Sequence, residues 1–255
     1  MSYSPITWVL LLGAALAGGA INALAGGGMF MVFPSLLFAG VAPITANATA
    51  TVTLMPGGWA STWVYRDRYA RYGWGLVGGM ALASLAGGWI GSELLLHTSN
   101  TQFAKLAPWL MFSATLLFTF AGQVRRLASS HSAQRTRAVP LVAGQLAISI
   151  YGGYFGAGMG VIMLALFMIT AHLDVQTASA IRIMCGSVTN LIAALIFAIR
   201  GIIDWRIGLP MLACAIAGGY IGARLVKRLN ENRARNVILV YAWTVTVWLV
   251  VRSYA

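Results

Sequence analysis

The chain has 255 residues, of which 17 are Lys or Arg and 5 are Asp or Glu, so its formal charge is +12. Only 9% of the residues are charged and 59% are hydrophobic, which excludes a soluble globular domain with its usual charged fraction of about 25% and also excludes a disordered chain. The basic residues lie in short clusters between long apolar runs. This pattern indicates an all-α integral membrane protein with several spans, and it argues against a nucleic-acid partner.

Six apolar segments have the length of about 20 residues that a single membrane-spanning helix needs. They are 46–65, 74–96, 106–122, 177–199, 205–223 and 236–251. Two further regions, 6–40 and 139–171, are too long for one upright helix and barely long enough for two. We therefore expect about 6–8 spans in total.

Each of the two long regions has glycines at its middle, Gly26 to Gly28 in the first and Gly152 to Gly160 in the second. Glycine permits a break or a tight turn at membrane depth, so we predict a broken helix or a re-entrant hairpin in each region. The alternative is that these glycines only let helices pack closely, as Gly-x-x-x-Gly motifs do.

The chain repeats itself after about 130 residues. The run from Ala25 to Met29 aligns with the run from Phe155 to Met159, and 86–91 aligns with 217–222. We therefore predict two homologous transmembrane halves, 1–122 and 139–255, joined by a basic linker at 123–138. Glycine-interrupted segments at corresponding places of two repeats indicate a transporter binding site.

The basic loops distinguish two topologies. If each long region crosses the membrane once, ten Lys and Arg residues lie on one side and six on the other. If each region turns back at its glycines, the loops 66–73, 123–138 and 224–235 share a side that holds twelve, against four. Because positive residues accumulate in cytoplasmic loops, we favour the second topology. In it the linker is cytoplasmic, both termini are outside and the halves are inverted repeats.

Several of these segments resemble the sulfite exporter TauE/SafE family. The resemblance rests on the runs Ala25 to Pro34, Ala46 to Ala50 and Gly156 to Gly160, on the helix of Arg182 and on the run Arg200 to Trp205, in this order along nearly the whole chain. It implies a multi-pass protein of the bacterial inner membrane that transports a small sulfur-containing anion, such as sulfite or an organosulfonate. Members differ in substrate, so the resemblance leaves the anion open.

A helix N-terminus can hold such an anion, because its free N–H groups and the helix dipole supply positive potential. The two glycine breaks would create two such N-termini, so we predict the substrate site there, with polar residues of the following helices as second candidates. For the polar residues, hydrogen bonds between helices are the alternative role. The predicted substrate-binding residues are Gly26, Gly27, Gly28, Met29, Asn47, Thr51, Gly156, Gly158, Met159, Gly160, Arg182 and Asn190.

Arg182 lies about five residues into an apolar segment. An arginine at the bilayer midplane costs at least about 2.5–3.5 kcal/mol and usually faces a cavity or a partner. Its planar guanidinium suits the oxygens of sulfite or a sulfonate. The alternative is that Arg182 snorkels to the nearby interface.

Glu93 is the one acidic residue well inside an apolar run, which makes it the candidate for proton coupling. The run ends at residue 96, which favours a place at the membrane edge. An anion that leaves a negative cell interior gains about 2.3 kcal/mol per charge per 100 mV. We therefore expect export or facilitated diffusion driven by the potential.

Other function classes fit the sequence less well. The His-Glu-x-x-His motif of zinc proteases is absent and the histidines are scattered, so we predict no enzymatic activity, no metal and no cofactor. A thiol–disulfide carrier would use Cys185 and Cys214, which do not correspond under the repeat. That carrier, and a membrane assembly or structural subunit without independent anion transport, are the alternatives.

Overall fold

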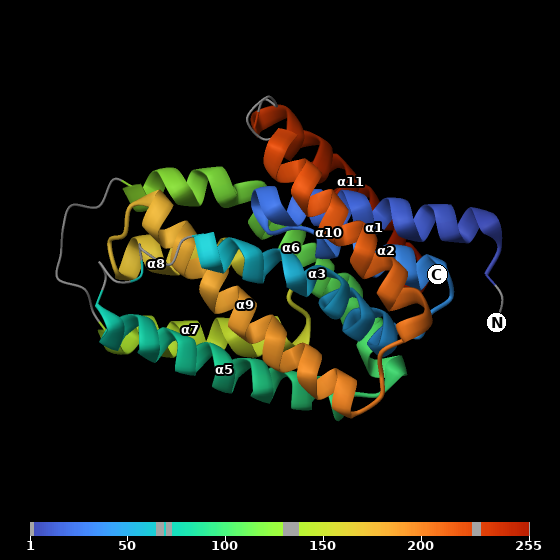
Figure 1. Ribbon diagram of the computed structural model, residues 1–255, viewed down its shortest axis with the longest axis horizontal. Coiled ribbons are helices and arrows are strands. Elements are labelled where there is room, and N and C mark those ends of the chain that lie inside the picture. Colours follow the sequence, from blue (N-terminus) through green and yellow to red (C-terminus); the bar gives the residue numbers. More distant parts are fainter. Residues whose placement is uncertain (1–2, 65–68, 70–72, 130–137, 226–230, 255) are drawn as a thin grey trace.

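The computed structural model describes residues 3–64, 69, 73–129, 138–225 and 231–254. These residues are helical, and no strand occurs among them (Figure 1). The helices are α1 (Pro5–Ala25), α2 (Met29–Phe38), α3 (Pro43–Val64), α5 (Trp74–Leu96), α6 (Asn100–Ser129), α7 (Ala138–Tyr154), α8 (Met159–Thr170), α9 (Val175–Ile199), α10 (Trp205–Leu225) and α11 (Glu231–Tyr254). The prediction of an all-helical membrane protein is confirmed.

Among the described residues, four helices are long and apolar enough to cross a membrane by length and composition. These stretches are Pro5–Asn22, Gly75–Leu96, Asn100–Phe120 and Gln176–Ile199. The six segments predicted as single spans lie in α3, α5, α6, α9, α10 and α11. Helix α6 continues to Ser129, so the first seven residues of the predicted 123–138 linker are helical; residues 130–137 lie outside the described part of the chain.

The first long apolar region forms two helices, with the glycines between them. Helix α1 ends at Ala25, and Gly26 follows with φ +74° while its N–H donates to the Asn22 carbonyl oxygen. Helix α2 begins at Met29. Because a side chain at positive φ is strained, Gly26 is suited to end α1 at this depth.

The second long region is divided in the same way. Helix α7 ends at Tyr154 and α8 begins at Met159. Gly156 and Gly158, which lie between these helices, have φ values of +82° and +74°. Each long region thus contains a helix break at its glycines.

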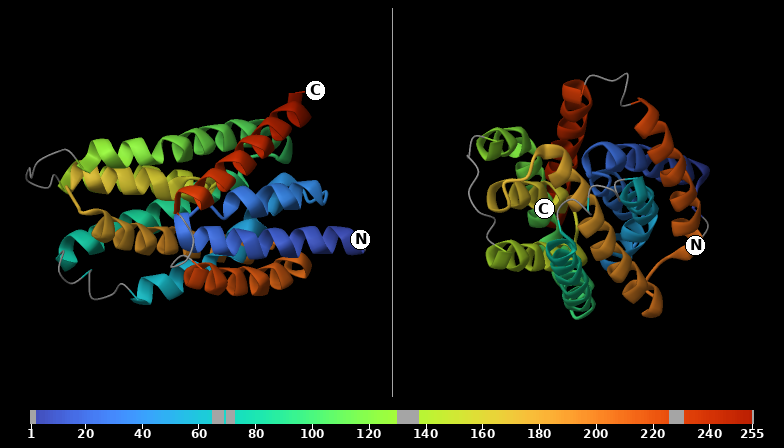
Figure 2. Two further views of the ribbon diagram at one scale, coloured as in Figure 1. Left: turned by 90° about the horizontal axis from the view of Figure 1, so that it is seen from above. Right: turned by 60° about the vertical axis from the view of Figure 1, so that its left-hand side comes forward.

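Contacts between helix ends define one end of the molecule, which we call the termini end. Here the Asn100 side chain at the start of α6 accepts a hydrogen bond from Ile44 N at the start of α3. Arg200, just after α9, contacts Glu93 near the end of α5, and Asp204 N, before α10, donates to Thr49 of α3. Both chain termini lie toward this same end (Figure 2).

The opposite end, which we call the linker end, is where α6 and α10 finish and where α7 and α9 begin. Helices α1 and α2 leave the termini end and return to it, because α2 leads into the start of α3. Helices α7 and α8 leave the linker end and return to it, because α8 leads into the start of α9. The two helical hairpins therefore enter the bundle from opposite ends (Figures 1 and 2).

The long helix of each hairpin packs closely against one other helix, α1 against α10 and α7 against α5. Along α1 and α10, a Cβ added at Gly218 would overlap the backbone of Leu16. Along α7 and α5, a Cβ added at Gly91 would overlap the carbonyl group of Ile150. Small residues allow this approach, which membrane helices use because lipid provides no hydrophobic drive for association.

Candidate functional site

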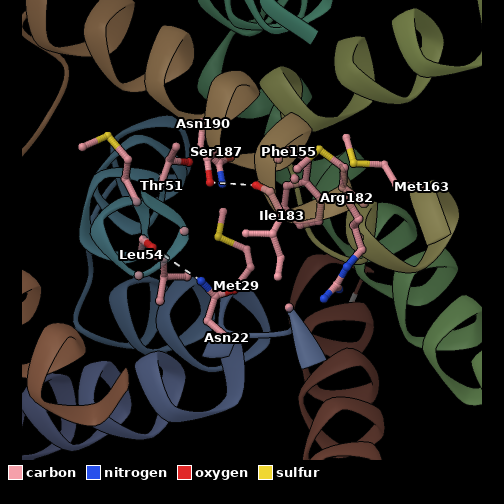
Figure 3. A pocket seen from close by; sticks show the side chains of 18 residues that line it. Asn22, Met29, Thr51, Leu54, Phe155, Met163, Arg182, Ile183, Ser187 and Asn190 are labelled. Atoms are coloured by element: carbon pink, nitrogen blue, oxygen red, sulfur yellow. Dashed lines mark hydrogen bonds between the residues drawn. The ribbon is translucent and has the colours of Figure 1, made fainter. Parts of the chain in front are cut away.

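A cavity of about 110 Å³ lies where the two hairpins meet α3 and α9 (Figure 3). Both glycine breaks reach it: Gly26 lines it from the first break and Gly156 from the second. Four methionines and three other large apolar residues form much of its wall. These are Met29, Met55, Met159, Met163, Leu54, Phe155 and Ile183.

Arg182 brings a positive charge to the cavity. It is the eighth residue of α9, about 10 Å along the helix from its start. A Cβ placed on Gly26 would lie 2.9 Å from Arg182 Nη1, and one placed on Gly160 would lie 2.8 Å from the same atom. The guanidinium therefore rests against glycines of both hairpins, and only glycine leaves it that room.

Two helix N-termini add to this positive potential. Met29 is the first residue of α2 and Met159 the first of α8, and both line the cavity. Several of the first N–H groups already donate to carbonyls of the breaks, those of Phe30 and Met31 to Gly27 O and Gly28 O and that of Met159 to Gly156 O. What each N-terminus adds is therefore mainly the helix dipole, which is equivalent to about half a positive charge. None of the described residues that line the cavity is acidic. The cavity is therefore suited to an anion.

Uncharged polar side chains form another part of the wall, away from the Arg182 guanidinium (Figure 3). Thr51 Oγ1 donates to Asn47 O at 2.9 Å and Ser187 Oγ donates to Ile183 O at 2.7 Å. Within the described part of the chain, the Asn190 side chain makes no hydrogen bond. Its amide therefore faces the cavity with its donors and acceptor available.

Two hydrogen bonds hold the second break in place. The Tyr151 hydroxyl donates to Ala157 O at 2.5 Å, across the break. Asn47 Nδ2, on α3, donates to Tyr154 O at 3.0 Å. The break is thus fixed both to α7 and to α3.

Comparison with known proteins identifies the family of this chain. The family model for the sulfite exporter TauE/SafE matches residues 10–249. The chain belongs to the TauE/SafE family. A Haemophilus influenzae relative, "Probable membrane transporter protein", is 27% identical over 236 residues, covering 90% of this chain and 89% of the relative. "Probable membrane transporter protein YfcA" of Escherichia coli K12 is 25% identical over 263 aligned positions, covering 98% and 92%.

A Sinorhizobium relative, "Probable membrane transporter protein ORF9", is 26% identical over 250 residues, covering 95% of this chain and 90% of the relative. The family membership predicted from the glycine motifs is therefore confirmed. This TauE/SafE protein is a multi-pass membrane transporter of the inner membrane with a small substrate.

The cavity brings together eight of the twelve residues predicted to bind substrate in this TauE/SafE protein. They are Gly26, Met29, Thr51, Gly156, Met159, Gly160, Arg182 and Asn190. These residues come from both hairpins and from α3 and α9. Their role in binding stays a prediction, now with a shared location.

The other four predicted residues do not line the cavity, because each faces a packing contact. A Cβ at Gly27 would meet Phe30 and Phe118, one at Gly28 would meet Gly18 and Leu54, and one at Gly158 would meet Ala114. Asn47 is directed at Tyr154 O. These residues pack behind the breaks, and their predicted contact with substrate stays a prediction.

Asn22 and Ser187 line the cavity but are absent from the predicted set. Asn22 Nδ2 donates to Leu54 O at 3.4 Å, which ties α1 to α3. A signal was present in the sequence: Asn22 is an amide in an otherwise apolar helix, one turn before Gly26. Ser187 precedes Asn190 by three residues, which puts both on one helix face.

Glu93 lies away from the cavity, at the termini end. Both of its carboxylate oxygens accept from Arg200 Nη2 at 3.3 Å. The two side chains are 25% and 56% exposed, and exposed ion pairs contribute only about 0–1 kcal/mol. Proton coupling through Glu93 stays a prediction.

Proposed function

We propose that this TauE/SafE protein exports a small sulfur-containing oxyanion, sulfite or an organosulfonate, across the bacterial inner membrane. The anion binds in the central cavity, at the glycine-broken N-termini of α2 and α8, near the middle of the bilayer. One observation carries the proposal: the Arg182 guanidinium lies against glycines of both hairpins, in a cavity that two helix N-termini line. Positive groups from three helices thus converge on one space.

The size of the cavity supports a substrate of this class. A water needs at least about 10–15 Å³ of such volume, so about 110 Å³ holds roughly seven water-sized groups. Sulfite has four heavy atoms and a two-carbon sulfonate has six. Either anion fits with its oxygens at the guanidinium.

We also propose that the halves are inverted repeats, with the linker end in the cytoplasm. The entry of the two hairpins from opposite ends supports this. Thr115 and Thr246 are hydrogen-bonded at 3.0 Å and the rings of Phe112 and Trp243 stack edge to face; the members of each pair stand 131 residues apart. Equivalent residues of two halves meet in this way only where a two-fold axis passes between them.

The close glycine contacts support the same symmetry. Gly218 meets Leu16 in one interface, and Gly87 meets Leu146 in the other. The glycines differ by 131 residues and the leucines by 130, which are the offsets of the sequence repeat. Exchanging the two halves therefore reproduces the contact.

Two arginines, Arg182 within α9 and Arg200 just after its end, test the proposed site. Arg182→Ala should lower saturable sulfite or sulfonate counterflow in proteoliposomes by at least tenfold, because it removes the cationic side chain of the cavity. Arg200→Ala is the matched control, since Arg200 leaves the same helix at the termini end, outside the cavity. Equal flux in the two variants, at equal protein levels, would contradict the proposed site.

The same assay tests the function itself. The purified protein alone should catalyse saturable anion flux, which a membrane assembly subunit would not do. A Cys185→Ser/Cys214→Ser variant should keep that flux, because neither thiol lines the cavity. Loss of flux in this variant would favour a thiol–disulfide carrier, and no flux with any anion would remove the proposal.

Glu93 provides a test of coupling. Because its carboxylate pairs with Arg200 outside the cavity, Glu93→Gln should leave flux under an imposed membrane potential unchanged. A pH gradient across the same liposomes should drive flux equally, and only weakly, in both proteins. A pH-driven flux that the variant loses would instead establish Glu93 as the coupling residue.

A further inference from the structure

The positive groups and the uncharged polar groups of the cavity lie at two different places. This separation affects which anion the cavity can bind. The positive groups gather at the breaks, where Gly26 and Gly160 contact the Arg182 guanidinium. We call this place the cationic pole. Thr51, Ser187 and Asn190 lie apart from it (Figure 3), and we call them the neutral pole.

Helix geometry gives the separation. Ser187 and Asn190 follow Arg182 by five and eight residues on α9, which is about 7.5 and 12 Å along the helix axis. Gly58 lets α3 approach the neutral pole closely, because a Cβ there would lie 2.5 Å from Ser187 Oγ. A ligand bound at the cationic pole therefore needs several atoms to reach the neutral pole.

Apolar side chains fill the space between the poles. Met29 and Ile183 lie between Arg182 and the neutral pole (Figure 3). Methionine is unbranched and adaptable, and it packs well against short carbon chains. A bare inorganic anion at Arg182 would leave this wall in contact with water.

The neutral pole contains hydroxyl and amide groups and no charge. A second carboxylate or sulfonate placed there would lose its hydration without a cation to replace it, and an ammonium group would lack a carboxylate. A hydroxyl group fits, because the Asn190 amide can both donate and accept. The cavity therefore matches a ligand that is charged at one end only.

We propose that the preferred substrate is an organosulfonate monoanion whose short carbon chain ends in a neutral hydrogen-bonding group such as a hydroxyl. This rests on the proposed function and narrows it. The sulfonate lies at Arg182, Gly26 and Gly160, the chain lies along Met29 and Ile183, and the terminal group bonds to Asn190. Sulfite, doubly charged sulfonates and zwitterions bind more weakly.

Competition in proteoliposome counterflow tests this with four probes of equal chain length: ethanesulfonate, 2-hydroxyethanesulfonate, 2-aminoethanesulfonate and sulfoacetate. The hydroxylated probe should compete at a concentration roughly fivefold lower than ethanesulfonate, the effect of about one added hydrogen bond. The amino and carboxylate probes should be weaker than ethanesulfonate. Sulfite is measured beside them.

Substitutions at Asn190 test whether the preference for the hydroxylated probe comes from the neutral pole. Asn190→Leu should remove the preference for the hydroxyl, so that 2-hydroxyethanesulfonate and ethanesulfonate compete at the same concentration in this variant. Asn190→Asp should reverse it in favour of 2-aminoethanesulfonate, because a carboxylate then faces the ammonium group. Thr244→Val, at an exposed position on α11, is the control and should keep the original order.

The outcomes separate this inference from the proposed function. Saturable flux with equal competition by the hydroxylated and plain probes, or with sulfoacetate or sulfite strongest, overturns the inference and leaves sulfur-anion transport standing. The order of the four probes in the unmodified protein decides this even if a variant fails to fold. Absence of flux with every anion overturns both.

Discussion

Two helix interfaces of this protein are built differently, although the proposed inverted repeat would make them equivalent. Where α1 meets α10, the buried contact is made by Ala15, Gly19 and Ala215. Where α7 meets α5, the corresponding residues are Gln145, Ser149 and Ser84, all fully buried. No side-chain hydrogen bond crosses the first interface among the described residues, so we call it dry; it depends on close backbone approach. The second interface is hydrogen-bonded.

The hydrogen-bonded interface forms a small network. Gln145 Nε2 donates to Ser84 Oγ and to Ser149 Oγ, both at 2.9 Å, and Thr189 Oγ1 of α9 donates to Ser149 Oγ at 3.2 Å. Directional bonds in a low-dielectric interior fix one register, while a dry interface of small residues fixes only a distance. The position of α7 against α5 is thus fixed by directional hydrogen bonds. The position of α1 against α10 is fixed by how closely the two backbones approach.

The largest effect should come from filling the dry interface. Gly19→Ala places a Cβ on the backbone of Ala215, so α1 and α10 must separate. We expect about 3 kcal/mol of lost stability or more, at the upper end of overpacking costs, seen as a large drop in thermal stability in detergent.

Gly13→Ala is the matched control for this prediction. It lies on the same helix, α1, and its added Cβ would have no neighbouring atom within 4 Å. It should be neutral or stabilising by up to about 1 kcal/mol. Similar losses in both variants would mean that the α1–α10 contact does not depend on spacing.

A smaller effect is expected from the network. Gln145→Leu removes one hydrogen bond between helices, to Ser84 of α5, and one within α7, to Ser149. Buried bonds between membrane helices average about 0.6 kcal/mol each, so we expect a loss of about 1 kcal/mol. Since Gln145 Oε1 is buried without a partner among the described residues, its removal offsets part of that cost. A loss as large as that of Gly19→Ala would show that the network, and not the spacing, dominates the packing.

Much of this fold could be predicted from the sequence, for reasons that particular residues make plain. Apolar length identified the single helices, and Gly26, Gly156 and Gly158 marked the breaks because positive φ is a local property that residue type reveals. The register between helices is not local. Asn22 lines the cavity only because α1 lies beside α3, and no pattern within α1 specifies that neighbour.

The same distinction explains the candidate site. Gly28 and Gly160 look alike in sequence, yet a Cβ at Gly28 would meet the backbone of Gly18 and one at Gly160 would meet Arg182. Which side of a glycine faces the cavity depends on how each hairpin rotates against its neighbours. No pattern within either hairpin specifies this, because the neighbours come from helices that are distant in the sequence.

The smallest change concerns two glycines, one in each hairpin, that lie against the Arg182 guanidinium. Gly160→Ala adds a methyl group 2.8 Å from Arg182 Nη1 within the first turn of α8, at a position without positive φ, so the side chain must shift while the fold stays intact. We expect counterflow to fall several-fold with thermal stability unchanged. Gly26→Ala adds the same group 2.9 Å from the same atom, but at φ +74°, where a side chain costs about 1–2 kcal/mol of strain. It should therefore lower both transport and stability. If Gly160→Ala left transport intact, the guanidinium would not need its place between the hairpins, and the convergence that supports the anion site would lose its functional meaning.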